Sequence, residues 1–171
     1  MKSKVYFTRE ITPEKVQEAY HKLGVSLPGK VAVKLHSGEQ GNQNYITPEF
    51  WKPMIDEIGG TVCETNTAYG DAAGGVRDHT GTHLKLIEEH GWNKYFAVDL
   101  MDAEGPDHVW PIPDGRVLKE NHVPNHITNY DSMLVLAHFK GHPMGGYGGA
   151  LKQLAIGCAS AKGKALIHSA G

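Results

Sequence analysis

The sequence has few cysteines, no long apolar run and no excess of basic residues. Its two cysteines, Cys63 and Cys158, provide neither a disulfide framework nor the spacing of a metal-binding motif. The formal net charge is −2 and the basic residues are scattered, which argues against a nucleic-acid partner. No apolar run is long enough to span a bilayer, and no signal peptide is recognisable. We therefore expect a cytoplasmic protein that binds neither nucleic acid nor a membrane.

Apolar runs typical of strands alternate with segments that have helical spacing. The predicted strands are residues 4–7, 30–36, 61–66, 95–100 and 132–138, and the predicted helices are residues 13–23, 48–58, 80–91 and 150–157. Thr12 and Thr47 each precede a proline, which is typical of a helix start, and Gly24 and Gly59 are placed to end these helices.

This alternation predicts an α/β fold with a mostly parallel, Rossmann-like sheet and helices on both faces. The length of 171 residues suits a single domain over residues 1–171. Prolines loosen the pattern between residues 103 and 129, where short strands at 109–112 and 116–119 predict a small β-hairpin insertion. Residues 165–168 resemble the start of a strand or turn, after which the sequence stops. We therefore expect the N-terminal portion of a longer protein.

The most specific chemical signal is the glycine-rich segment of residues 141–149. It follows the apolar run at 132–138 and precedes a segment with helical spacing, so it predicts a loop whose backbone N–H groups face an anion. His142 and Lys152 bracket this segment. It is neither a Walker A motif nor G-x-G-x-x-G. The alternative is a tight turn where backbone packs closely.

Polar residues follow four of the predicted strands, at residues 36–40, 64–71, 99–102 and 138–149. Ligands of open parallel sheets bind beyond the carboxyl ends of the strands. We therefore expect His142 and Lys152 to line one cavity, with Glu64, Asn66 or His83 within reach across it.

A characteristic pattern covers residues 140–152, 157–160 and 162–164. This pattern resembles the DUF362 family of uncharacterised proteins. Members of that family are often described as iron–sulfur centre proteins. Longer members of that family carry a ferredoxin-type cysteine cluster further along the chain. The resemblance implies that any iron–sulfur cluster lies in a C-terminal part outside these 171 residues. One function that follows is a non-catalytic module of an electron-transfer protein.

The same stretch is distantly similar to the lactate racemases that use a nickel-pincer nucleotide. His142, Lys152 and His168 stand at matching separations, ten and sixteen residues apart. The resemblance implies that Lys152 anchors the cofactor beside Gly145, Gly146, Gly148 and Gly149, that His168 ligates the metal, and that His142 and His83 act as acid or base. Gly148 replaces a serine of that family, and its Asp-x-Thr-Arg phosphate loop has no clear counterpart.

Two classes of function follow. The first is a cofactor- or anion-binding domain of a redox or isomerase-type enzyme, acting on a small anionic molecule or nucleotide. The second is the electron-transfer module described above. A homo-oligomer or a second domain would complete the site in the first class, because hydride chemistry requires water to be excluded.

Overall fold

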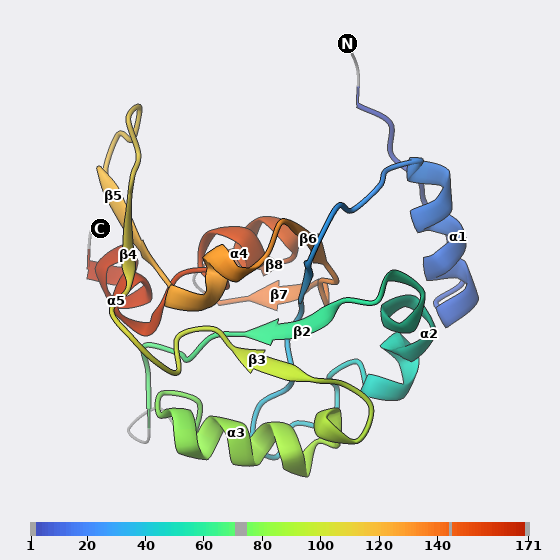
Figure 1. Ribbon diagram of the computed structural model, residues 1–171, viewed down its shortest axis with the longest axis horizontal. Coiled ribbons are helices and arrows are strands. Elements are labelled where there is room, and N and C mark those ends of the chain that lie inside the picture. The colour runs from blue at the N-terminus through green and yellow to red at the C-terminus, as the bar shows by residue number, and fades with distance from the viewer. Residues whose placement is uncertain (1–2, 71–74, 144, 170–171) are drawn as a thin grey trace.

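The computed structural model describes residues 3–70, 75–143 and 145–169 (Figure 1). A four-stranded parallel sheet lies at its centre, in the order β3-β2-β1-β6. The strands are β1 (Val31–Lys34), β2 (Thr61–Glu64), β3 (Val98–Leu100) and β6 (Ser132–Val135). Along the chain, β2 and β3 follow on one side of β1, and β6 then pairs with β1 on the other side. This confirms the predicted α/β, Rossmann-like fold and places its topological switch point between β1 and β6.

The first helices begin and end where their capping residues predict. In α1 (Pro13–Leu23), Thr12 Oγ1 accepts a hydrogen bond from the Lys15 N–H at 3.3 Å, and Gly24 ends the helix in the left-handed conformation. Helix α2 (Pro48–Ile58) likewise follows Thr47 and ends at Gly59, whose φ is 64°. Helix α3 (Thr80–Glu89) is followed by a short 3-10 helix over Trp92–Lys94. Glycine suits the C-caps of α1 and α2 because it carries no Cβ and therefore adopts the left-handed conformation readily.

Alternating residues of the strands enter two hydrophobic clusters. Val33, Leu35 and Val62 belong to the larger one, which includes side chains of α2 and α3: Trp51, Met54, Ile55 and Ile87. Ala32 and Cys63 belong to the smaller one with Met101, and Ile127, Tyr130 and Met133 pack against it. Ile127 belongs to the 3-10 helix Asn125–Asn129. The period-two pattern of each strand therefore buries both faces of the sheet.

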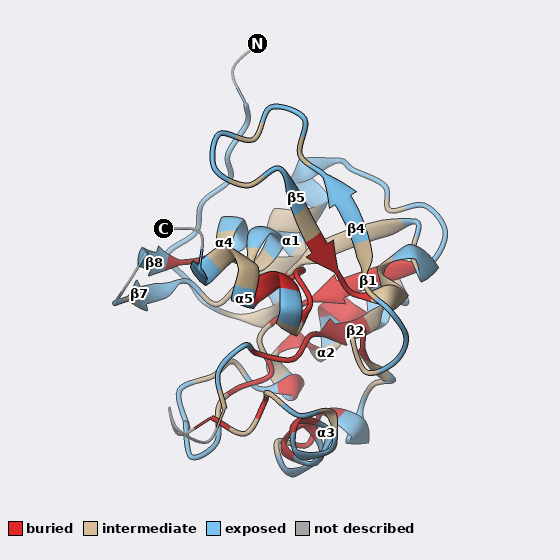
Figure 2. Cartoon of the chain, turned by 90° about the vertical axis from the view of Figure 1, so that its left-hand side faces the viewer, coloured by how far each residue is buried: buried red, intermediate tan, exposed pale blue. Residues whose placement is uncertain are grey.

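The glycine-rich segment forms a hairpin rather than an open loop. Strand β7 (Lys140–His142) pairs antiparallel with β8 (Gly146–Gly148), and α4 (Ala150–Ala155) follows with Lys152 inside it. The helix containing Lys152 is as predicted, but it has only six residues. Figure 2 shows β7 and β8 largely exposed, whereas buried residues gather in β1 and β2.

Two other sequence predictions are wrong. Residues 4–7 pair with no strand within the described chain, and Val5 and Phe7 are both 85% exposed. Residues 165–168 lie inside a helix, α5 (Ala161–Ser169). The helix is capped by Ser160, whose Oγ accepts from the Gly163 N–H at 3.1 Å, and by Asp102, which accepts from the Ala161 N–H at 3.1 Å. Ser160 is the start signal that the sequence reading overlooked.

The predicted hairpin insertion is present, with a shifted second strand. Strand β4 (His108–Pro111) pairs antiparallel with β5 (Glu120–Val123), so the second strand begins four residues later than expected. Helix α5 packs on β5. Among the described residues, none of the helices combines the length and apolar character that crossing a membrane requires.

Candidate functional site

A cavity of about 280 Å³ opens at the carboxyl ends of the parallel strands. Its wall includes Lys34 at the end of β1, Glu64 at the end of β2 and His138 beyond β6. Helices α4 and α5 add Lys152 and Lys164. The cavity thus lies beside the switch point of the sheet, where α/β folds of this kind bind ligands.

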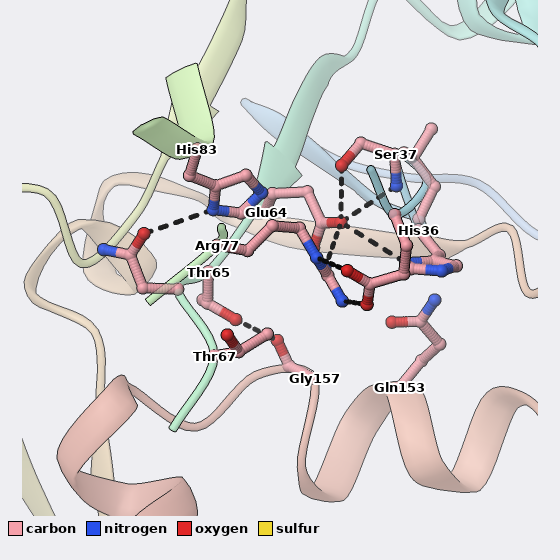
Figure 3. A network of polar contacts seen from close by, with 12 residues as sticks. His36, Ser37, Glu64, Thr65, Thr67, Arg77, His83, Gln153 and Gly157 are labelled. Carbon is pink, nitrogen blue, oxygen red and sulfur yellow. Dashed lines mark hydrogen bonds and ion pairs between the residues drawn. The ribbon is translucent and has the colours of Figure 1, made fainter. Parts of the chain in front are cut away.

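A buried ion pair forms the base of this cavity. Lys34 Nζ donates to Glu64 Oε2 at 2.7 Å, to the Leu35 carbonyl at 2.7 Å and to Gln153 Oε1 at 3.0 Å. Glu64 Oε1 accepts from both the N–H and the hydroxyl of Ser37 (Figure 3). Burial alone raises the pKa of Glu64, but Lys34, His36 and Arg77 outweigh it and hold that pKa well below the usual range. The Glu64 carboxylate is therefore charged at neutral pH.

The loop after β1 is held in place by two side chains that follow α3. The Ser37 carbonyl accepts from Trp92 Nε1 at 3.0 Å and lies 2.9 Å from His90 Nδ1. Gly38 has a φ of 106°, and a Cβ there would lie 2.7 Å from the His90 ring. This position requires glycine for both reasons. The clamp fixes the Ser37 N–H that donates to Glu64.

Arg77 closes one side of the cavity. Its Nε donates to Glu39 Oε2 at 2.9 Å, its Nη2 contacts Glu39 Oε1, and its Nη1 lies 3.7 Å from Glu64 Oε1. Tyr69 also donates to Glu39 Oε1, at 3.0 Å. Arg77 is 6% exposed although it belongs to the long loop between β2 and α3. Sequence reasoning missed it, because no local pattern marks a loop arginine for burial.

Lys164 lies buried at the N-terminal part of α5. Its ammonium donates to Thr65 Oγ1 at 2.6 Å, to the Asn66 carbonyl at 2.6 Å and to the Ala159 carbonyl at 2.7 Å. Burial lowers its pKa to about 8. Thr65 in turn donates to the Gly157 carbonyl at 2.8 Å. Lys164 therefore joins the segment after α4 to the end of β2.

The cavity carries an excess of positive charge. Glu64 is engaged by Lys34, and Glu39 by Arg77. Within the described ranges, no carboxylate forms an ion pair with Lys140, Lys152 or Lys164, although all three line the cavity. Burial lowers the pKa of each of these lysines. Three ammonium groups in one recess favour an anionic ligand.

The structure brings His142 and Lys152 to this same cavity, as expected, and His168 also lies in its wall. Lys152 Nζ contacts His142 Nε2 directly, and the Gly145 N–H donates to His142 Nδ1 at 3.0 Å. The pKa of His142 is lowered by burial and by the charges of its neighbours Lys152, His168 and Lys140. Gly148 and Gly149 line the cavity, whereas Gly145 and Gly146 are not among its described lining residues, and Gly146 begins β8 opposite His142.

His83 lies deeper in the protein. The described wall of the cavity includes Glu64 but neither Asn66 nor His83. His83 is fully buried, its Nδ1 lies 3.1 Å from Asn66 Oδ1, and its Nε2 has no hydrogen-bond partner within the described residues. Burial lowers its pKa to about 4, so the ring is neutral at pH 7. Of the three groups expected across the cavity, Glu64 is the one in its wall.

The described residues include no group of three or more His, Cys, Asp or Glu side chains placed to hold a metal ion. His168 lies near His142, but no such set surrounds it. Burial raises the pKa of the Cys63 thiol to about 12 and also raises that of Cys158. Neither cysteine is therefore prepared to act as a thiolate ligand. The metal role of His168 stays a prediction.

A family model described as a domain of unknown function, DUF362, matches residues 31–171. Neither a curated protein nor a solved structure matches the chain significantly. The matched region contains the whole sheet, the cavity-lining lysines and the β7–β8 hairpin.

Proposed function

The chain belongs to the DUF362 family, and we propose that its cavity binds a small anionic molecule or nucleotide. The charge of the cavity carries this proposal: Lys140, Lys152 and Lys164 line it, while the carboxylates of Glu64 and Glu39 are already engaged. An anion would supply the missing negative charge in a partly desolvated recess. The volume of about 280 Å³ is close to the lower limit of small-molecule sites, which favours a compact ligand or one part of a larger one.

We further propose that the anion is the substrate or cofactor of a redox or isomerase-type enzyme. His142 is the proposed general acid or base. Its lowered pKa keeps the ring neutral at neutral pH, which is the form that accepts a proton from a substrate during a reaction. Lys152, in contact with His142, is the proposed anchor of the ligand. His83 is the second acid–base candidate, since its buried ring is neutral and held through Nδ1 by Asn66.

The racemase resemblance would make the ligand a nickel-pincer nucleotide, a group that accepts hydride when bound. The lysines of the cavity suit the phosphate of such a nucleotide, but the described residues offer no set of three metal donors. The proposal is therefore limited to the anion. An iron–sulfur cluster needs thiolates, and the buried Cys63 and Cys158 do not supply them. The electron-transfer alternative thus requires cysteines from outside these residues.

Calorimetric titration of the full chain tests the proposal. The probes are AMP, nicotinate mononucleotide and inorganic phosphate, with uncharged adenosine as the comparison. Lys140→Met removes one ammonium from the cavity and should weaken binding of the anionic probes about tenfold, as expected for one charge-assisted hydrogen bond. Lys162→Met removes an exposed lysine of α5 that is not among the cavity-lining residues, and should bind like the wild type. Failure of every anionic probe to bind, or equal loss in both variants, would refute the proposal.

A further inference from the structure

The segment that leads from β2 to Tyr69 is held by hydrogen bonds to other parts of the chain. The Asn66 N–H donates to Asp102 Oδ1 at 2.8 Å, and the Thr67 N–H donates to the Arg77 carbonyl at 2.8 Å. The Thr67 hydroxyl donates to the Tyr69 carbonyl at 2.9 Å. Asn66 and Thr67 are both buried, so water does not compete strongly for these bonds. The backbone that carries Tyr69 is therefore fixed in place.

The side chain of Tyr69 is held at its hydroxyl while its ring stays accessible. The hydroxyl donates to Glu39 Oε1 at 3.0 Å, and Glu39 also accepts from Arg77 Nε at 2.9 Å. A Cβ at Gly75 would lie 3.1 Å from two carbon atoms of the ring, so the backbone of Gly75 packs closely beside it. Tyr69 is nevertheless 46% exposed and belongs to the cavity wall. The cavity thus contains an aromatic ring whose position is set before any ligand binds.

This ring and the cations of the cavity come from different elements. Tyr69 belongs to the loop between β2 and α3, whereas Lys140 and Lys152 belong to β7 and α4. Ile156, which follows α4, adds an apolar side chain to the wall. An inorganic anion would contact the cations alone and would leave the ring and Ile156 facing water. A ligand with an anionic group and a planar apolar group would use both kinds of surface.

We propose that the cavity binds a phosphate attached to a planar ring, as in a nucleoside monophosphate, and that Tyr69 stacks on this ring while the lysines bind the phosphate. This inference rests on the anion binding proposed above. A phosphomonoester carries a charge of roughly −1.5 to −2 at pH 7 and three acceptor oxygens, which suits several lysines in one recess. Every nucleobase has a π-face that can stack on an aromatic side chain. The volume of about 280 Å³ favours a mononucleotide over a dinucleotide.

The test is calorimetric titration of the full chain with anions that differ in their ring. AMP carries a base, ribose 5-phosphate and sulfate carry no aromatic ring, and phenyl phosphate carries a ring without ribose. AMP should bind about tenfold more tightly than ribose 5-phosphate, which is the gain expected from one base–aromatic stack. Tighter binding of AMP than of phenyl phosphate would identify a nucleotide as the ligand. The reverse order would identify a smaller aryl phosphate held by the same stacking.

Variants of Tyr69 separate stacking from general anion binding. Tyr69→Leu removes the ring and should weaken AMP binding about tenfold, while ribose 5-phosphate and sulfate bind as in the wild type. Tyr69→Phe keeps the ring and should bind AMP more like the wild type than like Tyr69→Leu. Tyr95→Leu removes a similarly exposed tyrosine that is not among the described lining residues, and should match the wild type. In proton NMR spectra, bound AMP should show upfield shifts of adenine H2 and H8 in the wild type and not in Tyr69→Leu.

The outcomes distinguish this inference from the proposal on which it rests. Equal affinity for AMP and ribose 5-phosphate, or wild-type binding of AMP by Tyr69→Leu, would overturn the inference and leave anion binding intact. An equal loss of AMP and sulfate binding in Tyr69→Leu would likewise show that the ring does not act by stacking. If none of the anions binds, both proposals fail.

Discussion

Lys34 and Glu64 form a buried ion pair of 2.7 Å between the ends of two neighbouring parallel strands. Both side chains are almost fully inaccessible, and each has further hydrogen bonds to the loop or helix beside it. The pair occupies the base of the cavity and neutralises itself there. Among the described residues, no carboxylate forms an ion pair with the other lysines of the cavity, and this supports the anion binding proposed above.

Replacing Glu64 with Gln should strongly destabilise the protein. The substitution leaves the Lys34 ammonium buried without a counter-charge, which costs about 3–5 kcal/mol when one partner of a buried pair is removed. Urea unfolding followed by circular dichroism measures this cost. Glu88→Gln removes an exposed carboxylate from α3 and should change stability by less than about 0.5 kcal/mol. Equal stability of the two variants would contradict a structural role for the pair.

His83 should make the protein sensitive to mild acid. Its folded-state pKa is about 4, below the ordinary value of 6.5, so the unfolded chain binds a proton more readily as pH falls below 6.5. Stability due to the neutral ring is complete above pH 6.5 and declines toward pH 4, with a loss of about 2 kcal/mol between pH 7 and pH 5.

This loss can be assigned to His83 by comparing how steeply the free energy of unfolding falls between pH 7 and pH 5 in the wild type and in variants. We call this decline the slope. Urea unfolding at pH 7 and pH 5 should show a decline about 2 kcal/mol smaller in His83→Gln than in the wild type, whatever the absolute stability of the variant. His79→Gln changes an exposed histidine that precedes the same helix and should keep the wild-type slope. A wild-type slope in His83→Gln would show that the ring titrates normally.

Local signals in the sequence predicted most of the helices and the parallel strands. Thr12 and Gly24 bound α1 because capping and the left-handed conformation depend on neighbouring residues alone. The glycine-rich hairpin was not predictable in this way. Glycine disfavours strands, yet β8 begins at Gly146, whose φ of 73° is a conformation that glycine adopts readily.

The cavity was predictable in its location but not in its full set of residues. Strand order placed His142, Lys152 and Glu64 at one edge, because carboxyl ends of parallel strands converge. The roles of Arg77 and Lys164 depend on partners far away in sequence: Lys164 Nζ donates to Thr65 Oγ1 across 99 positions. A lysine within a Lys-Gly-Lys segment is normally solvated, so only the tertiary structure reveals that it is buried.

Trp92 should contribute to stability through its indole N–H as well as its ring. Trp92→Phe keeps an aromatic side chain but removes its hydrogen bond to the Ser37 carbonyl, which then has only His90 beside it, and loss of one such bond costs about 0.5–1.5 kcal/mol. Trp110→Phe changes a half-exposed tryptophan of β4 and should be within about 0.5 kcal/mol of the wild type. Urea unfolding distinguishes the two, and an equal effect would show that the clamp on Ser37 is unimportant.

Gly163 should prove essential for the position of α5. A Cβ at this residue would lie 2.1 Å from the His122 carbonyl oxygen of β5, so Gly163→Ala must push the helix away from that strand. Overpacking of this kind costs about 1–3 kcal/mol. Because α5 carries Lys164 and His168 to the cavity wall, the same variant should also weaken the proposed anion binding.

The matched control is Gly81→Ala in α3, where a Cβ meets nothing within 4 Å. Alanine is the better helix former, so this variant should be as stable as the wild type or more stable by up to about 1 kcal/mol. Thermal unfolding and sulfate titration of both variants provide the comparison. Wild-type stability in Gly163→Ala would mean that α5 does not pack closely on β5. Wild-type sulfate affinity in a destabilised Gly163→Ala would instead show that the anion does not depend on Lys164 and His168.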